Sequence, residues 1–271
     1  MAREGVRDAT QGYRPCPSLP PSGRPGRRRG LLPVTDLAHG IDPQEAIAPQ
    51  VMRALREAIV RTDLPPGALI SEADIARRFG VSRQPVREAF IKLQEAGLVG
   101  IRPQRGTQVL RISMEEVVNA RFVREAVEAA VVHEAAETRP AGLAARLAAL
   151  IAEQEKAAEA GDGVGFLRLD EAFHRALAQG IGRDFAWSVL EGIKAQMDRV
   201  RFLSFEGATP MADIIGQHRA IVGAIATGDA PAAEAAMRRH LREILSSLPK
   251  IAEAHPDYFV PRDDRAARTA A

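Results

Sequence analysis

The sequence predicts a mainly α-helical protein in two parts: a helix-turn-helix with a small β-hairpin, followed by an antiparallel α-helical bundle. Two observations predict this class. Residues 71–97 hold two short amphipathic helical patterns joined by a glycine-containing turn, which is the helix-turn-helix pattern. From Ser113 onwards, long alanine-rich segments with helical periodicity alternate with short breaks, as in helical bundles. Aromatic residues are only 4% of the 271 residues, which suits a helical protein.

The first 45 residues are rich in proline, glycine and arginine and show no helical or strand period. We expect residues 1–45 to form a disordered head. The segment RPGRRRG at 24–30 is basic enough to act as an arm that searches for DNA. The plainer interpretation is an unstructured head without that role, or a misassigned start codon. The single cysteine, Cys16, lies here and excludes a disulfide framework.

Three helices are predicted between residues 46 and 97. The first runs from Pro49 to Thr62 and is ended by LPPG at 64–67. The second begins after Ser71 as its N-cap and ends at Gly80, and Ser82 caps the third. Apolar residues recur with helical spacing in each of them: Val51, Leu55 and Ile59 in the first, Ile75, Ala76 and Phe79 in the second, and Val86, Ala89, Phe90 and Leu93 in the third.

The third helix carries Ser82, Arg83, Gln84 and Arg87 on its first turns, where a recognition helix contacts base edges and phosphates. Residues 100–110 then predict two short strands around the basic turn PQRG, which makes the motif a winged helix. Residues 46–112 contain 11 Lys and Arg against 6 Asp and Glu, whereas residues 113–256 contain 16 against 21. A basic first part is the expected electrostatic footprint of DNA binding. The alternative is an ordinary helical hairpin with a solvated basic face.

The segment VSRQPVREAFIKLQEAGLV, together with LPPGALISEADIARRFG before it, resembles the signature of the GntR family of transcriptional regulators. The resemblance implies DNA contacts from Ser82, Arg83, Pro85 and Arg87 on the recognition helix, and from Arg105 and Gly106 at the tip of the wing. Gln84 replaces the usual threonine and belongs to the same predicted DNA-binding set. Ala73 stands where some members carry a DNA-contacting arginine. Both departures leave the operator sequence open, but not DNA binding.

The second part is predicted to contain six helices joined by short loops, near 114–138, 140–160, 164–180, 184–206, 210–227 and 230–248. Asp229 is a suitable N-cap, and Pro231 suits the first turn of the last helix. The predicted domains are the head at 1–45, the winged helix at 46–112, a helical effector-binding, metal-binding and dimerisation domain at 113–252, and a flexible tail at 253–271.

One acidic residue and three histidines fall on predicted inward faces of three helices. Asp170 and His174 are four residues apart, so they share one helix face. His218 lies among isoleucines and valine, and His240 is flanked by methionine and leucine. A single buried histidine is usually a satisfied core residue, but this set of nitrogen and carboxylate ligands suits Zn²⁺, Ni²⁺, Mn²⁺ or Fe²⁺. Spacing alone leaves both interpretations open.

The patterns D-x-x-FH, QHRAI and M-x-x-HL resemble the FCD ligand-binding domain of the FadR subfamily of GntR regulators. The resemblance implies that Asp170, His174, His218 and His240 hold a divalent metal, for which we expect Zn²⁺ first. Six helices fit the shorter, VanR-like form of this domain better than the seven-helix form. Gln217 stands where glutamate is common, and Gly182-Arg183-Asp184 replaces a frequent Asn-Pro. These departures leave the ligand open.

The segment REAVE at 124–128 is similar to a family pattern that carries an arginine on the first bundle helix. The resemblance implies that Arg124 faces the cavity and pairs with a ligand carboxylate, which its planar guanidinium suits. The alternative is a surface arginine in an i,i+4 pair with Glu128. A divalent metal and Arg124 carry more positive charge than Asp170 balances. We therefore expect a small carboxylate as the effector.

The predicted function is that of a transcriptional regulator that binds a short inverted repeat in double-stranded DNA as a homodimer and responds to a small carboxylate metabolite. The alternative is a metal-dependent enzyme using the same Asp and His residues, but no motif supplies a general base. We therefore predict no enzymatic activity. No apolar run reaches the roughly 18 residues of a membrane span, and no leader is visible, so we expect a cytoplasmic protein. No role is predicted for His39, His133, Trp187 or His255.

Overall fold

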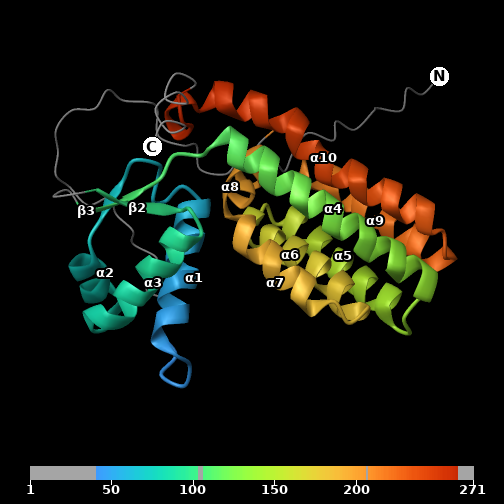
Figure 1. The fold of residues 1–271 in the computed structure, drawn as a ribbon, viewed down its shortest axis with the longest axis horizontal. Helices are drawn as coiled ribbons and strands as arrows, with labels where there is room; N and C mark the ends of the chain where they lie inside the picture. The colour runs from blue at the N-terminus through green and yellow to red at the C-terminus, as the bar shows by residue number, and fades with distance from the viewer. Residues whose placement is uncertain (1–40, 103–105, 206, 262–271) are drawn as a thin grey trace, which may run out of the picture. The chain divides into compact units, whose positions relative to one another are not determined.

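The computed structural model describes residues 41–102, 106–205 and 207–261 (Figure 1). Cys16, the RPGRRRG segment and Arg105 therefore lie outside the described residues. The observed class is the predicted one: helices dominate, a small antiparallel sheet follows the helix-turn-helix, and a helical domain completes the chain. None of the helices in these ranges is long and apolar enough to cross a membrane.

The winged helix consists of three helices and three strands. In chain order they are α1 (Ile47–Val60), β1 (Leu69–Ile70), α2 (Glu72–Phe79), α3 (Arg83–Glu95), β2 (Val99–Arg102) and β3 (Gly106–Val109). The sheet is antiparallel in the order β1-β3-β2, so β2 and β3 form the predicted hairpin. β1 was not predicted, because two residues are too short to show an alternating pattern.

The predicted apolar faces of α1, α2 and α3 form one core. Val51, Leu55, Val86 and Leu93 are all fully buried, and they pack with residues of β2 and β3. Gly80 ends α2 in the left-handed conformation with φ 66°, which glycine adopts without steric cost. This sharp ending directs the chain into α3 and presents the first turns of α3 to solvent.

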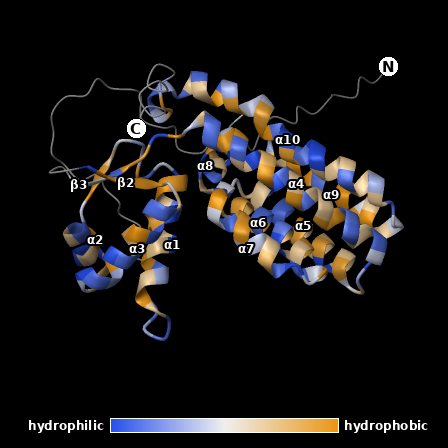
Figure 2. Ribbon diagram, in the orientation of Figure 1, coloured by the Kyte–Doolittle hydropathy of each residue, from blue (hydrophilic) through white to orange (hydrophobic). Residues whose placement is uncertain are grey.

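The helical domain contains α4 (Met114–Thr138), α5 (Leu143–Glu159), α6 (Gly163–Gly180), α7 (Asp184–Ile193), α8 (Ala195–Ser204), α9 (Met211–Thr227) and α10 (Ala230–Ala254), followed by the short 3-10 helix η1 (Pro256–Tyr258). α4 and α10 are the longest and run side by side, and α9 packs against both (Figure 1). Figure 2 shows both apolar and polar residues along these helices. Buried apolar residues such as Phe166, Phe173 and Trp187 form the core of the domain.

Two predictions for this domain were wrong. The described part of the domain has seven α-helices rather than six, because the predicted 184–206 segment is two helices that meet at Lys194. Gly192 lies in the last turn of α7, two residues before the break, but it does not itself end the helix. Lys194 is buried and binds Asp198 and Glu171, so tertiary contacts set the break. The seventh helix removes the reason for preferring the VanR-like form.

The last helix also extends further than predicted. α10 continues through Pro249 to Ala254 instead of ending near residue 248. Beyond it, Phe259 forms a parallel bridge with Ile112, the residue that leads from β3 into α4. Tyr258 O accepts from Ile112 N at 2.8 Å, and Val260 N donates to Ile112 O at 3.0 Å. The predicted flexible tail at 253–271 is therefore ordered at least through Val260.

Candidate functional site

The predicted DNA-binding residues of α3 lie on an accessible surface. Ser82, Arg83, Gln84 and Arg87 are exposed, and Pro85 is half-buried at the start of the helix. Arg83 and Arg87 are four residues apart, so they lie on one face, and neither pairs with a carboxylate of a described residue. Two uncompensated guanidinium groups at the start of α3 are available to phosphates and base edges.

Gln84 and Gly106, two other predicted DNA contacts, differ in how far they are engaged within the protein. Gln84 Nε2 donates to Glu88 Oε1 at 3.0 Å, so its amide is partly engaged on the helix itself. Gly106 is exposed at the beginning of β3 with φ 93°, a conformation that favours glycine. This conformation suits a glycine at the first residue of β3, whereas Arg105 falls in the undescribed segment before it.

The four predicted metal ligands come together in the bundle. Asp170 and His174 lie on α6, His218 on α9 and His240 on α10. All four are buried, and one ligand atom of each lies within 4.8 Å of all the others. Helical spacing on three separate helices therefore converges on one point, as the sequence predicts.

Each of the three histidines is held by a different side chain through its Nδ1 atom. Glu128 contacts Nδ1 of His174 closely, Gln154 Oε1 lies 2.8 Å from Nδ1 of His218, and Gln217 Oε1 lies 2.8 Å from Nδ1 of His240. The amide oxygens can only accept, so the Nδ1 atoms of His218 and His240 carry the proton.

The Nε2 atoms of the histidines consequently face the centre of the cluster. The Nε2 atoms of His174 and His240 lie 3.1 Å apart, and Nε2 of His218 lies 3.5 Å from Asp170 Oδ1. Nε2 of His218 is buried without a hydrogen-bond partner in the described chain. Burial lowers the pKa of His218 to about 3 and that of His240 well below its usual value, so both rings are neutral. Neutral imidazoles with free Nε2 lone pairs are the form that binds metals.

Asp170 already has a cationic partner that the sequence did not reveal. The two terminal nitrogens of Arg201 on α8 donate to the two carboxylate oxygens of Asp170 at 2.6 and 2.5 Å. This fork geometry is the strong form of an arginine–carboxylate pair. Burial would raise the pKa of Asp170, but Arg201 and its other neighbours outweigh that effect and lower it. The carboxylate is thus ionised and able to accept a metal.

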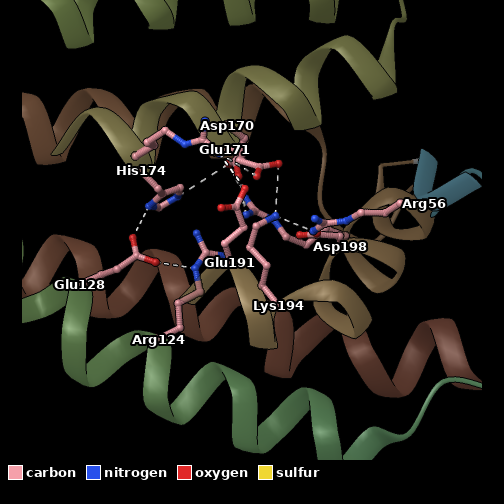
Figure 3. Close-up of polar contacts among 11 residues, drawn as sticks. Arg56, Arg124, Glu128, Asp170, Glu171, His174, Glu191, Lys194 and Asp198 are labelled. Carbon is pink, nitrogen blue, oxygen red and sulfur yellow. Dashed lines mark hydrogen bonds and ion pairs between the residues drawn. The ribbon is translucent and has the colours of Figure 1, made fainter. Parts of the chain in front are cut away.

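Arg124 makes the predicted i,i+4 pair but not on the surface. It pairs with Glu128 one turn further along α4, with Nε to Oε1 at 2.5 Å, but both residues are buried rather than on the surface. Figure 3 shows Glu128 between Arg124 and His174, in contact with each. Burial would raise the pKa of Glu128, but Arg124 and His174 together lower it to about 2. Glu128 therefore joins the predicted effector residue to the histidine cluster.

A cavity of about 30 Å³ lies beside this cluster. Its wall includes Arg124, Arg201, Gln217 and His240, so it opens on one of the candidate ligands. Residues of α8, α9, α10 and the connection between α8 and α9 complete the lining: Met197, Ser204, Thr209, Ile214, Leu241, Glu243, Ile244 and Ser247. The arrangement offers two cations, hydroxyl groups and apolar surface to a small molecule.

Sequence reasoning missed Glu128, Gln154 and Arg201 as parts of this site. Glu128 had a signal, because it ends the REAVE motif that carries Arg124. Gln154 and Arg201 had none, since each lies on a helix without another predicted site residue, and only packing brings them to the cluster. Trp187 lies in the core, and His133 is half-buried beside Glu234, so neither joins the site.

Comparisons with known proteins match both parts of the chain. The model of the bacterial regulatory proteins of the gntR family matches residues 47–109, and the FCD domain model matches residues 120–243. The HTH-type transcriptional repressor RspR of Escherichia coli K12 is 41% identical over 219 residues, which cover 81% of this chain and 96% of that protein. A probable D-xylose utilization operon transcriptional repressor of Paenarthrobacter nicotinovorans is 32% identical over 214 residues, covering 73% and 87% of the two chains.

Solved structures agree with these relatives. A putative transcriptional regulator GntR from Rhodococcus sp. RHA1 superposes with a TM-score of 0.65 at 26% identity and covers 74% of this chain and 97% of that one. E. coli McbR/YncC has a TM-score of 0.66 at 18% identity, covers 78% and 100% of the two chains, and supports the fold. The named relatives are transcriptional regulators and not enzymes, so the enzymatic alternative has no support.

Proposed function

Because the chain belongs to the GntR family and carries an FCD domain, it is a DNA-binding transcriptional regulator, and we propose how it is controlled. A small organic acid binds in the helical domain beside a divalent metal and changes the affinity for the operator. The protein acts in the cytoplasm as a homodimer on a short inverted repeat. The winged helix spans residues 46–112, and the effector and dimerisation domain spans residues 113–252.

The operator contacts in this proposal come from Ser82, Arg83, Gln84, Pro85 and Arg87, with Arg105 and Gly106 on the wing. Two observations support the assignment: the α3 residues are exposed, and among the described residues its two arginines have no carboxylate partner. Arginine can bind guanine through two hydrogen bonds in the major groove, or a phosphate. Which of these each arginine does depends on the operator sequence.

The metal proposal rests on one observation above all: three buried histidines are each anchored through Nδ1 and direct Nε2 at one carboxylate. Outer hydrogen bonds of this kind fix the ring orientation of metal-binding histidines. The proposed ligands are Asp170, His174, His218 and His240. Zn²⁺ is the first candidate for the ion, and Ni²⁺, Mn²⁺ and Fe²⁺ suit the same donors. When bound, the ion supplies a positive charge that binds an effector carboxylate.

Charge balance supports an anionic effector. In the buried site, Arg124 and Arg201 are balanced by Asp170 and Glu128. A divalent ion therefore adds two uncompensated positive charges to a buried site. Uncompensated charge in an apolar interior is costly, so an organic anion that reaches the ion and Arg124 stabilises the loaded protein.

The DNA-binding proposal is tested with Arg83→Ala and Arg87→Ala. Each change should weaken binding to an oligonucleotide selected by the wild-type protein, by about 1–3 kcal/mol for a lost base contact. Lys92→Ala is the matched control, because Lys92 is an exposed cation further along α3 that pairs with Glu95. Fluorescence anisotropy at one fixed salt concentration gives the affinities. Wild-type affinity in both arginine variants would show that α3 does not read the operator.

The metal proposal is tested on protein purified without a histidine tag. Elemental analysis should find about one divalent ion per chain in the wild type, and little in the double variant His218→Ala, His240→Ala. His133→Ala is the control, because His133 lies on α4 away from the cluster and contacts Glu234. Full metal content in the double variant would refute these ligands.

The effector proposal is tested by thermal shift with organic acids and neutral metabolites. An acid at a hundredfold excess over its Kd should raise the stability by roughly 2.7 kcal/mol. Arg124→Ala should remove most of that response. Stabilisation by neutral metabolites alone, or an acid response that persists in Arg124→Ala, would contradict the proposed pocket.

A further inference from the structure

We propose that Gln84 reads an adenine in the major groove of the operator, and that Glu88 orients the Gln84 amide for that contact. This inference rests on the proposed function, because it takes the first turns of α3 to face the base edges. It goes further by assigning one base of the operator. It also gives a positioning role to Glu88, which is not among the proposed operator contacts.

Gln84 and Glu88 lie on an exposed face of the recognition helix. Gln84 is the second residue of α3 and Glu88 follows one turn later, so their side chains are neighbours on the helix surface. Both are exposed, and each directly follows an exposed arginine, Arg83 or Arg87. The side chains of a helix lean towards its N-terminus, so Gln84 extends towards the end of α3 that the proposed function places against the bases.

The contact between the two side chains has only one possible polarity. Nε2 of Gln84 donates to Oε1 of Glu88 at 3.0 Å. A carboxylate can only accept hydrogen bonds, so the amide nitrogen of Gln84 must face Glu88 and the amide oxygen must point away from it. A flipped amide would place two oxygen atoms against each other. The bond therefore fixes where Gln84 presents its donor and where it presents its acceptor.

Glu88 has no cationic partner among the described residues. Lys92 stands one turn further along α3, within reach of Glu88 by its spacing, but it pairs with Glu95 at 2.8 Å. A carboxylate on a surface that approaches phosphates weakens DNA binding by charge repulsion. The contact that the structure shows for Glu88 is the one with the Gln84 amide, and the selectivity of that amide offsets the repulsion.

The remaining edge of the Gln84 amide matches adenine. Once one N–H donates to Glu88, the amide keeps its oxygen as an acceptor and its second N–H as a donor, and neither has a partner within the described chain. Among the four bases, only adenine presents an acceptor, N7, beside a donor, the N6 amino group, in the major groove. Guanine presents two acceptors there, and its O6 would meet the amide oxygen. The fixed amide thus favours A·T over G·C.

The other polar side chains at the start of α3 cannot supply this preference. Arg83 and Arg87 carry only donors, which suit guanine or phosphate. The hydroxyl of Ser82 rotates to donate or to accept, so it bonds to different bases without selecting one. Gln84 alone among these four side chains combines a donor and an acceptor in one rigid plane.

The test begins with the sequences that the full chain selects from a pool of random double-stranded DNA. Wild type should select adenine at a position where Gln84→Thr shows no base preference, while the two proteins agree at the other positions. Gln94→Thr is the matched control, because Gln94 is an exposed glutamine on a later turn of α3. It should select the wild-type sequence.

Modified bases then test the contact itself at that adenine. 7-Deazaadenine carries a C–H group in place of N7 and so removes the acceptor for the Gln84 N–H. Fluorescence anisotropy at one fixed salt concentration should show that 7-deazaadenine weakens wild-type binding by about fivefold or more. Replacing A·T by G·C should weaken it by roughly 5- to 150-fold. Gln84→Thr should lose less than about twofold on 7-deazaadenine.

Glu88→Gln tests the positioning role. Its amide can donate to a flipped Gln84, so the orientation is no longer fixed, and the preference for A·T over G·C should fall by at least about threefold. In the Gln84→Thr background the same change should leave that ratio unaltered, because Glu88 acts through Gln84. Glu95→Gln removes an exposed carboxylate from the same helix and should change the affinity for both operators equally. These side chains are exposed, so the variants keep the fold.

Several outcomes would overturn this inference and leave the proposed α3 contacts standing. If no adenine preference depends on Gln84, or if 7-deazaadenine weakens Gln84→Thr as much as wild type, Gln84 does not read that base. A uniform loss of affinity for all sequences in Gln84→Thr would assign Gln84 to a phosphate. Loss of a cytosine preference in Glu88→Gln would mean that Glu88 contacts a base itself. Wild-type affinity in Arg83→Ala and Arg87→Ala would instead refute the proposed use of α3 and this inference together.

Discussion

Glu125 on α4 is a single carboxylate surrounded by three arginines. It contacts Arg121 one turn before it, and it accepts hydrogen bonds from Arg238 at 3.1 Å and Arg242 at 2.5 Å on α10. The hydrogen bond from Arg242 is the largest influence, and together these groups lower the pKa of Glu125 from 4.5 to about 2. The cluster joins the two longest helices of the domain.

We predict that Glu125→Gln destabilises the protein at neutral pH. A pKa lowered from 4.5 to about 2 corresponds to roughly 3 kcal/mol at most. Because Arg238 and Arg242 are 38% and 58% exposed, solvent screening reduces the effect to about 1–2 kcal/mol.

The pH dependence of this effect follows from the direction of the pKa change. The pKa is lower in the folded protein, so the stability is present above about pH 4.5 and lost as the pH falls towards 2. Urea unfolding at pH 7 and at pH 3.5 should therefore show a smaller difference between wild type and variant at the lower pH. Exposed Glu137→Gln is the control, and an equal difference at both pH values would exclude this explanation.

At the scale of single elements, α8 contacts both the cavity and the winged helix. Met197, Arg201 and Ser204 line the cavity, whereas Gln196 donates to Gly97 O at 2.7 Å and Asp198 accepts from Arg56 at 2.6 Å. Figure 3 shows Asp198 between Lys194 and Arg56. A ligand that displaces α8 would therefore change the contacts of α8 with α1 and with the end of the recognition helix.

We predict that Asp198→Asn destabilises the protein and weakens the response of DNA binding to the acid. The change leaves Lys194 buried without its nearest carboxylate, which costs on the order of 3 kcal/mol. Asp198 is outside the cavity lining, so acid affinity should stay within about twofold. Asp213→Asn, at an exposed position in the first turn of α9, is the control. Urea unfolding measures stability, and operator binding with and without the acid measures the response. If the acid changes operator affinity equally in Asp198→Asn and wild type, α8 does not carry the regulatory signal.

The break between α7 and α8 shows where prediction from sequence stops. Periodicity gave the helices that end at glycine or proline, and the spacing of Asp170 and His174 placed both residues on one helix face, because these signals are local. The break at Lys194 depends on partners on α6 and within α8, and Arg201 reaches Asp170 from another helix. Such contacts form only when segments that are distant in the sequence pack together. A single sequence contains no local pattern that predicts this packing.

At the scale of the whole molecule, residues 110–112 connect the winged helix to α4 and are held from two directions. Nη1 of Arg199 on α8 donates to Leu110 O at 2.9 Å, and the segment from Tyr258 to Val260 pairs with Ile112. Phe259 is 4% exposed and packs in a cluster with Ile112, Val117, Met197 and Leu248. The connection is therefore part of a packed core.

We predict that Phe259→Ala loosens this connection and destabilises the protein by about 3 kcal/mol, as expected for a buried phenylalanine. Phe185→Ala is a matched control, because Phe185 is 82% exposed and its removal should cost little. Urea unfolding gives the energies. Hydrogen exchange at the amide of Ile112 should become faster in Phe259→Ala only. Equal exchange in both variants would mean that Phe259 does not hold the connection.

The pairing of Ile112 with Tyr258 and Val260 also sets the order in which parts of the protein fold during translation. The winged helix has its own apolar core and can form as soon as it leaves the ribosome, since the members of that core lie within residues 41–109 apart from Ala195. The strand that pins Ile112 is translated only after all of α4 to α10. Until then the nascent chain has a complete DNA-binding surface, but residues 110–112 lack their pairing with Tyr258 to Val260. Such a chain can bind an operator before a ligand can control it.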